Sequence, residues 1–151
     1  MNTLRSEWAS KIATTSWKVG GMLWSSTNTA KQYYTTELGS SSSSTTYNAK
    51  VGLMYVSEYG YAASPENWNM PLNNYANDTN RNNNWLYMGA PEWTISRSSD
   101  GSNGVFVVDV VGGVVYGYVY LSSGVRSSFS LESSVVLSGG SGTSDDPFRV
   151  N

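Results

Sequence analysis

The sequence predicts an α+β fold with two short N-terminal helices and a twisted, mainly antiparallel sheet that carries long irregular loops. Two segments in the first quarter of the chain repeat apolar side chains at helical spacing. In the second half, short β-branched and aromatic runs alternate with turn residues, which is typical of antiparallel strands. A length of 151 residues suits a single domain over residues 1–151.

The first predicted helix covers residues 3–13 and the second covers residues 29–38. Thr3 can cap the first, and Asn28 or Thr29 can cap the second, because a short polar side chain accepts hydrogen bonds from the first free amides of a helix.

Between and after these helices the pattern predicts short elements joined by loops. A strand is expected over 16–24, a polar mobile loop over 40–46 and a buried strand over 50–56. A helical turn capped by Ser57 should follow over 57–63.

Residues 64–84 form the longest irregular stretch. The segment is rich in Asn, but it also carries apolar residues that a disordered linker would not need, namely Trp68, Met70, Leu72 and Tyr75. We therefore expect an ordered loop that folds over the body of the domain.

The second half is centred on a hairpin with Gly112 and Gly113 as its two-residue turn. This turn would place Val111 opposite Val114 and Asp109 opposite Tyr116. One face would then be entirely apolar, and the other would carry Asp109 and a row of tyrosines. Further strands are expected over 85–88, 92–96, 125–132, 135–137 and 147–150, with a turn over 98–104.

Composition excludes several kinds of chemistry. The chain has no Cys and no His, which removes disulfides, thiolate metal sites and the usual Ser-His-Asp and Cys-His catalytic groups. A net charge of −2 provides no basic patch for nucleic acid or an anionic membrane. Asp145 and Asp146 offer oxygen ligands to calcium, but a turn leading into Pro147 is favoured, so no cofactor is expected and calcium stays an alternative.

Catalysis by carboxylates is the remaining enzymatic option. A glycosidase needs a pair of carboxylates, and two of the following residues could form one: Glu58, Glu66, Glu92, Asp100 and Asp109. The pairing of Asp109 with Tyr116 is the most enzyme-like, but a carboxylate accepting a tyrosine hydroxyl is common on sheets. We expect the protein not to be an enzyme.

The surplus of aromatic rings and amides indicates binding, since rings cover area at low entropic cost and amides supply hydrogen bonds. Trp85 and Trp93 are expected in the core, and Arg126 is expected to pair with Glu132 or Asp109 or to bind loop carbonyls. Replacing Trp68 or Tyr75 by alanine should weaken binding and leave the melting temperature nearly unchanged. The predicted ligand-binding residues are Trp68, Tyr75, Arg81, Tyr87, Arg97, Asp100, Asn103, Tyr118 and Tyr120.

Five motifs carry a resemblance to a known group; they lie, in order, at residues 51–62, 84–87, 92–96, 124–126 and 139–148. The chain resembles bacterial extracellular domains, frequent in gut Firmicutes, that often follow a prepilin-like segment or close a cell-surface protein. That group looks related to the C-type-lectin-like superfamily. Ser127 and Arg97 stand where relatives often have Pro, which puts the rigidity of the loop face in doubt. Formylglycine chemistry, known in this superfamily, needs cysteines and is not carried over.

The resemblance implies a single C-type-lectin-like domain, with Trp93 and Arg126 holding the fold together. No secretory signal is recognisable at residues 1–8, so an extracellular domain cut from a longer precursor is expected, without membrane contact in this segment. We expect a non-catalytic adhesion module that binds a cell-surface glycan or protein. The alternative is a structural head of a pilin-like or phage tail-fibre subunit that assembles with neighbouring subunits.

Overall fold

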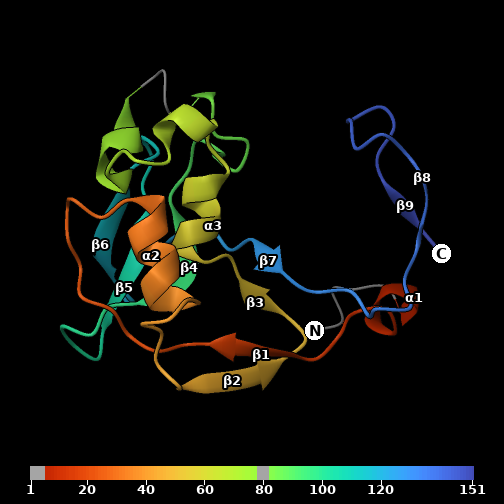
Figure 1. Cartoon of the computed structure of the whole chain (residues 1–151), viewed down its shortest axis with the longest axis horizontal. Coiled ribbons are helices and arrows are strands. Elements are labelled where there is room, and N and C mark those ends of the chain that lie inside the picture. Colours follow the sequence, from red (N-terminus) through yellow and green to blue (C-terminus); the bar gives the residue numbers. More distant parts are fainter. Residues whose placement is uncertain (1–5, 78–81) are drawn as a thin grey trace.

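The computed structural model describes residues 6–77 and 82–151 and shows a mixed α+β chain built from small antiparallel sheets (Figure 1). The helices are α1 (Ser6–Ala9), α2 (Ala30–Glu37) and α3 (Val56–Tyr61), with 3₁₀ turns η1 (Pro65–Asn67) and η2 (Leu72–Ala76). The strand pairs outside the main sheet are β1 (Thr15–Lys18) with β2 (Thr46–Ala49), β3 (Gly52–Leu53) with β7 (Ser127–Ser128), and β8 (Leu137–Gly139) with β9 (Arg149–Val150). The main sheet has the order β4 (Glu92–Arg97), β5 (Gly104–Val108) and β6 (Val114–Tyr118).

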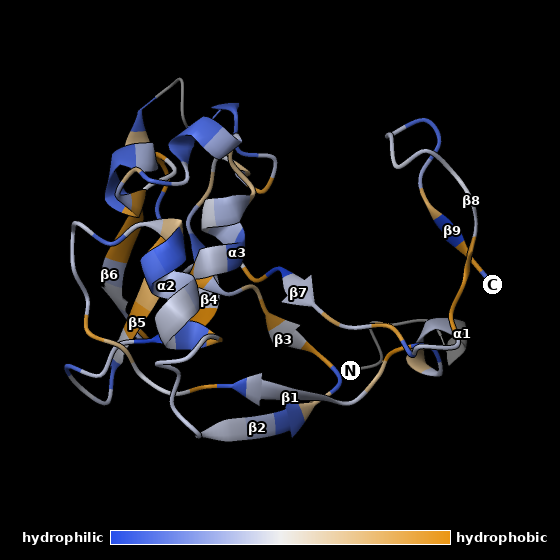
Figure 2. Cartoon of the chain, viewed as in Figure 1, coloured by the Kyte–Doolittle hydropathy of each residue, from blue (hydrophilic) through white to orange (hydrophobic). Residues whose placement is uncertain are grey.

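The core lies between this main sheet and helices α2 and α3. Figure 2 shows hydrophobic residues concentrated in β5 and β6, while α2 carries many hydrophilic ones. Tyr33 of α2 meets Phe106 of β5 edge to face, with ring centroids 5.6 Å apart. Tyr59 of α3 is fully buried and donates its hydroxyl hydrogen bond to the carbonyl of Gly112 at 2.7 Å. Helix, sheet and hairpin turn are thereby joined through aromatic side chains.

The two N-terminal helices differ from their prediction in length. Thr29 caps α2: its hydroxyl accepts from the amide of Gln32, whose side chain accepts in return from the amide of Thr29. By contrast, α1 is a single turn, so a helix over 3–13 is not confirmed. Ile12 instead forms a β-bridge with Leu131 and is buried there, so a tertiary contact replaces the helical turn.

The predicted hairpin exists, but its register is wrong by three residues. Phe106 lies opposite Tyr116 and Val108 opposite Val114, and the turn runs from Asp109 to Gly113. The physical reason is the Asp109 carboxylate, which accepts from the amides of Val111 at 3.0 Å and of Gly113 at 2.9 Å. Gly112 supplies the positive φ of +88° inside this wider turn. Phe106 and Tyr116 therefore share a face, and the predicted division of the two faces does not hold.

Several other strands are shorter than their patterns predict. Residues 16–24 contribute to β1 only up to Lys18, and within 50–56 the strand β3 contains only Gly52 and Leu53. The expected strand over 85–88 is a turn, and 125–132 contain only β7. The strand over 92–96 is confirmed as β4, and 135–137 and 147–150 are represented by the short β8 and β9. Helix α3 starts one residue before Ser57, with the Glu58 carboxylate accepting from the amide of Tyr55 at 2.8 Å.

The loop after α3 is ordered in its described parts, as its apolar residues predict. It contains η1 and η2, and Leu72 is buried, with its amide donating to the carbonyl of Asn28 at 2.9 Å. Asn84 is buried as well and donates to the carbonyl of Tyr59 at 2.8 Å. Residues 78–81 lie outside the described part.

Residues 130–151, here called the C-terminal arm, leave the body after β7 and end in the β8–β9 hairpin (Figure 1). The hairpin stands away from the main sheet, and the base of the arm lies beside α1. Among the described residues, no helix is both long and apolar enough to cross a membrane.

Candidate functional site

The structure brings four of the nine predicted binding residues together at one end of the main sheet. Tyr118 and Tyr120 lie at and just after the end of β6, while Asp100 and Asn103 lie in the adjacent turn between β4 and β5. The amide of Val119 donates to the carbonyl of Asn103 at 3.1 Å, which joins the two segments.

The remaining five predicted residues lie elsewhere. The ring of Tyr75 is fully buried and its hydroxyl donates to carbonyls of the core, so the expectation of a solvent-facing Tyr75 is wrong. Tyr87 is half-buried and donates to the carbonyl of Val110 at 2.7 Å. Arg97 is exposed at the end of β4, against Gly21. Arg81 lies outside the described residues, and Trp68 lies in the loop after α3.

Trp68 is partly exposed, as its loop position predicts, whereas Trp85 does not lie in the core. The indole N–H of Trp68 donates to the carbonyl of Ala63 at 2.8 Å, and the ring meets Tyr61 edge to face at 5.1 Å. Trp68 therefore supports its loop while keeping part of its surface exposed. Trp85, expected in the core, is 78% exposed, so that expectation is wrong. Trp93 is half-buried on β4.

Three rings in a row form the centre of the site, which we call the tyrosine ladder: Tyr116, Tyr118 and Tyr120. Tyr116 and Tyr118 meet edge to face at 5.2 Å, and Tyr118 and Tyr120 stack at 5.2 Å with an interplanar angle of 9°. Side chains two residues apart on a strand share a face, which places Tyr116 beside Tyr118, and Tyr120 continues the row in the turn after β6. Tyr120, the outermost ring of the row, is 71% exposed.

Gly104 makes room for the first ring of the ladder. A Cβ atom at this position would lie 2.5 Å from the hydroxyl oxygen of Tyr116 and 2.9 Å from its ring carbons. Only glycine therefore allows Tyr116 to lie across β5. Desolvation raises the pKa of the Tyr116 phenol, and the neighbouring Tyr118 and Asp100 raise it further.

The turn between β4 and β5, beside the tyrosine ladder, holds the carboxylate of Asp100 in place. Ser98, fully buried, donates its hydroxyl to the Asp100 carboxylate and accepts from the Asp100 amide, both at 3.1 Å. Its own amide donates to the carbonyl of Gly104 at 3.0 Å. The result is a rigid polar flank, Asp100 with Asn103, next to three phenols. Such a surface can stack against apolar ring faces and exchange hydrogen bonds with hydroxyl groups.

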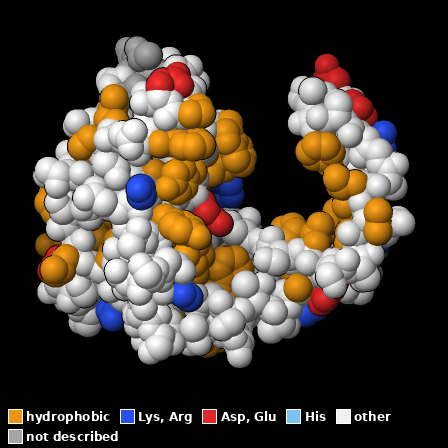
Figure 3. Space-filling view, viewed as in Figure 1, with side chains coloured by type: hydrophobic (Ala, Val, Ile, Leu, Met, Phe, Trp, Pro, Cys, Tyr) orange, Lys and Arg blue, Asp and Glu red, His pale blue; other side chains and the backbone are white. Residues whose placement is uncertain are grey.

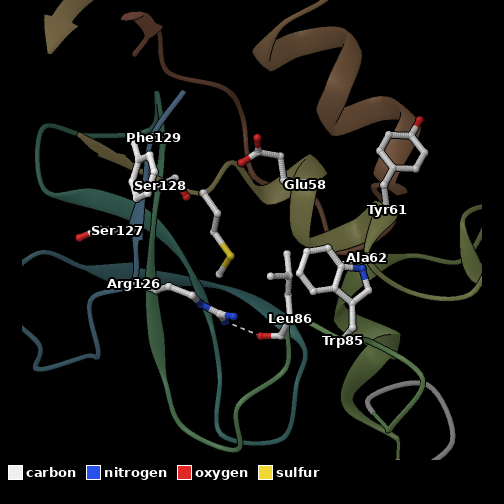
Figure 4. A pocket seen from close by; sticks show the side chains of 10 residues that line it. Glu58, Tyr61, Ala62, Trp85, Leu86, Arg126, Ser127, Ser128 and Phe129 are labelled. Carbon is white, nitrogen blue, oxygen red and sulfur yellow. Dashed lines mark hydrogen bonds between the residues drawn. The ribbon is translucent and has the colours of Figure 1, made fainter. Parts of the chain in front are cut away.

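A second surface is concave. A groove of about 580 Å³ opens between the α3 region and the segment around β7 (Figure 4). Arg126 in this groove is already engaged, donating to the Glu92 carboxylate and to the carbonyl of Leu86. The pairing of Arg126 with a loop carbonyl is confirmed, whereas its carboxylate partner is Glu92 and neither Glu132 nor Asp109. The groove is lined by Met54, Glu58, Tyr61, Ala62, Trp85, Leu86, Arg126, Ser127, Ser128 and Phe129.

Two of the carboxylates considered for catalysis are occupied by structural contacts. Asp109 closes the hairpin turn, and Glu92 is buried against Arg126. Asp146 accepts from the amide of Ser141 at 2.9 Å and from Arg149 at 3.1 Å, which is the turn favoured over a calcium site. Within residues 6–77 and 82–151, no cluster of three or more acidic side chains is suited to a metal ion.

Comparisons of the chain with family models, with curated proteins and with solved structures find no match.

Proposed function

We propose that this protein is a non-catalytic binding module that holds a glycan on the tyrosine ladder. The observation that carries the proposal is the preorganised row of Tyr116, Tyr118 and Tyr120, flanked by Asp100 and Asn103. Sugars present apolar C–H faces and many hydroxyl groups, so exposed phenol rings beside a carboxylate and an amide match both features. A protein surface is the other partner that rings and amides fit.

The cellular setting belongs to the same proposal. We place the module outside a bacterial cell, within a longer surface protein, and we assign it to the C-type-lectin-like domains. The order of the five sequence motifs supports this assignment, and so does the mixed α+β architecture with short helices and small antiparallel sheets. A crystal structure of the domain, compared with lectin-like domains, tests it.

Glycan-array screening of the full chain, followed by calorimetric titration of the strongest hit, tests the binding role. Tyr120→Ala should lower the affinity at least tenfold, because losing one stacked ring is worth roughly 1.4 kcal/mol or more. Its melting temperature should stay within about 2 °C of the parent value, since an exposed side chain contributes little to folding.

Tyr47→Ala is the matched control, because Tyr47 is equally exposed but lies on β2. It should bind the glycan as the parent does. If the parent and Tyr120→Ala bind the glycan with equal affinity, the tyrosine ladder is not the binding site. Absence of any glycan hit, with a hit on an array of surface proteins, would shift the proposal to a protein partner.

A structural function is the second candidate, favoured by the apolar side chains on the C-terminal arm. Val136, Leu137 and Phe148 are all exposed, so the arm offers a surface that suits contact with a neighbouring subunit. In this alternative the domain is the head of a self-assembling pilin-like or tail-fibre subunit. Light scattering that shows open-ended growth with concentration would distinguish such assembly from a soluble binding module.

A further inference from the structure

The C-terminal arm ends in a hairpin that its own chain leaves uncovered. Its strands β8 and β9 contain three and two residues, and an isolated two-stranded hairpin is at best marginally stable in water. Leu137 is 62% exposed and Phe148 61% exposed. Removing such side chains from water would stabilise the hairpin, because the transfer of apolar surface out of water is favourable.

The body presents an apolar surface of its own, on the other side of the open space that separates it from the C-terminal arm. Trp85 and Phe129 are exposed at the rim of the groove, with Met54, Tyr61 and Leu86 beneath or beside them (Figure 4). In the space-filling view, hydrophobic side chains line the body and the arm on both sides of the open space between them (Figure 3). The charged groups among the groove residues are Glu58 and Arg126, and Arg126 is neutralised by Glu92.

Backbone hydrogen bonds fix the base of the arm to the segment that follows α1. The amide of Ala13 donates to the carbonyl of Ser130 at 2.9 Å, and the amide of Glu132 donates to the carbonyl of Lys11 at 2.8 Å. These two bonds flank the β-bridge between Ile12 and Leu131, and the side chain of Ile12 is buried there. With its base fixed there, the hairpin stands apart from the groove of its own chain (Figure 1), so the hairpin and the groove are both open to a second molecule.

The exposed area is large enough for a stable dimer. The chain exposes 8863 Å², whereas a compact monomer of 16.4 kDa exposes about 7,500 Å². The excess is roughly 1,400 Å² per molecule, and a standard stable interface buries about 800 Å² per partner. Each copy supplies both an arm and a groove, so two copies related by a two-fold axis can cover both surfaces at once.

We propose that the C-terminal arm of one copy docks in the apolar groove of a second copy, and the second arm docks in the first groove. The tyrosine ladder lies at the far end of the main sheet and takes no part in this contact. The exchanged dimer therefore presents two ladders, which would raise the avidity of glycan binding under the proposed function.

Cysteine cross-linking tests the exchange, because the chain has no native Cys. Trp85→Cys and Phe148→Cys each replace an exposed side chain, one in the groove and one in the arm. Mixing the two full-length single variants under mild oxidation should give a disulfide-linked dimer on a non-reducing gel. Mixing Trp85→Cys with Tyr47→Cys, exposed on β2, is the control and should give far less.

The mass in solution provides the second measurement. Light scattering of the parent should show twice 16.4 kDa, falling to one chain in the double variant Leu137→Ser/Phe148→Ser. If light scattering of the parent gave the mass of a single chain at every concentration, the proposed exchange would be overturned. An internal disulfide in the Trp85→Cys/Phe148→Cys double variant, or equal cross-linking to the Tyr47→Cys control, would overturn it as well. Tyr120→Ala should remain dimeric, so a failure of glycan binding is distinguishable from a failure of the dimer.

Discussion

At the scale of single residues, the most unusual group is the buried carboxylate of Glu37 at the end of α2. It accepts hydrogen bonds from the amides of Val56 and Ser57, at 3.1 and 3.0 Å, and from the hydroxyl of Ser96. Desolvation by burial nevertheless raises its pKa above the ordinary value of 4.5, and these hydrogen bonds only partly oppose the rise.

The raised pKa predicts a pH dependence of stability. The native state keeps the Glu37 proton to higher pH than the unfolded chain does, so the raised pKa contributes to the free energy of unfolding. This contribution is fully present below about pH 4.5 and is lost as the pH rises through the pKa of Glu37 in the native state. Urea unfolding at several pH values should show this loss in the parent. Glu37→Gln, which cannot ionise, should show a flatter profile over the same window. Identical slopes for the two proteins would contradict the assignment.

Gly104 provides the second prediction at this scale. Gly104→Ala should displace the Tyr116 ring and lower the free energy of unfolding by about 1–3 kcal/mol, because overpacking forces a side chain out of its position. Near-ultraviolet circular dichroism should report the disturbed tyrosines. Gly101→Ala is the control in the same turn: its Cβ would meet only the side-chain oxygen of Asn103 at 3.4 Å, so stability should change little. If both variants lose the same free energy of unfolding, the close approach of the Tyr116 ring is not the reason for a glycine at position 104.

At the scale of elements, the hairpin shows what sequence pattern can and cannot determine. Two apolar runs around a glycine pair predict a hairpin correctly, since both runs have strong β-propensity. The register fails because Val110 and Val111 look like strand residues but lie in the turn that the Asp109 carboxylate closes. A local hydrogen bond competes successfully with propensity.

The same turn supplies a test. Asp109→Ala removes the acceptor of two backbone amides, so the free energy of unfolding should fall by about 2 kcal/mol, as expected for hydrogen bonds to a charged group. Asp109→Asn keeps an oxygen in place and should recover much of that loss. The urea midpoint of both variants checks the expectation. Equal losses in both would mean that the negative charge matters more than the acceptor.

At the scale of the whole molecule, the long loop and the candidate site were only partly predictable. A row of tyrosines at every second residue predicts a common face, and the ladder has that arrangement. In the irregular loop no period tells which ring points inward, so the sequence predicts Tyr75 outside. A short apolar run over 85–88 predicts a strand with Trp85 in the core, but the run forms a turn that exposes the ring. The groove joins residues 54–62, 85–86 and 126–129, and only the tertiary fold brings these segments together.

Among the contacts that join the C-terminal part of the chain to the body is the ion pair of Arg126 with Glu92, supported by the carbonyl of Leu86. The Arg126 Nε donates to Oε1 of Glu92 at 3.0 Å, and its terminal nitrogen bridges the other carboxylate oxygen and that carbonyl. Glu92 is buried, so removing its partner leaves an uncompensated charge. Arg126→Ala should therefore lower the free energy of unfolding by about 3–5 kcal/mol.

A double-mutant cycle measures that coupling by urea unfolding. The Arg126→Ala/Glu92→Gln pair should lose less than the sum of the two single variants, because the second substitution removes the buried charge that the first leaves unpaired. Arg126→Lys should fall between parent and alanine, since one ammonium group cannot contact both carboxylate oxygens and the Leu86 carbonyl in the same planar arrangement. Additive losses would mean that the two side chains act independently. β7 would then be held to the body mainly by its backbone pairing with β3.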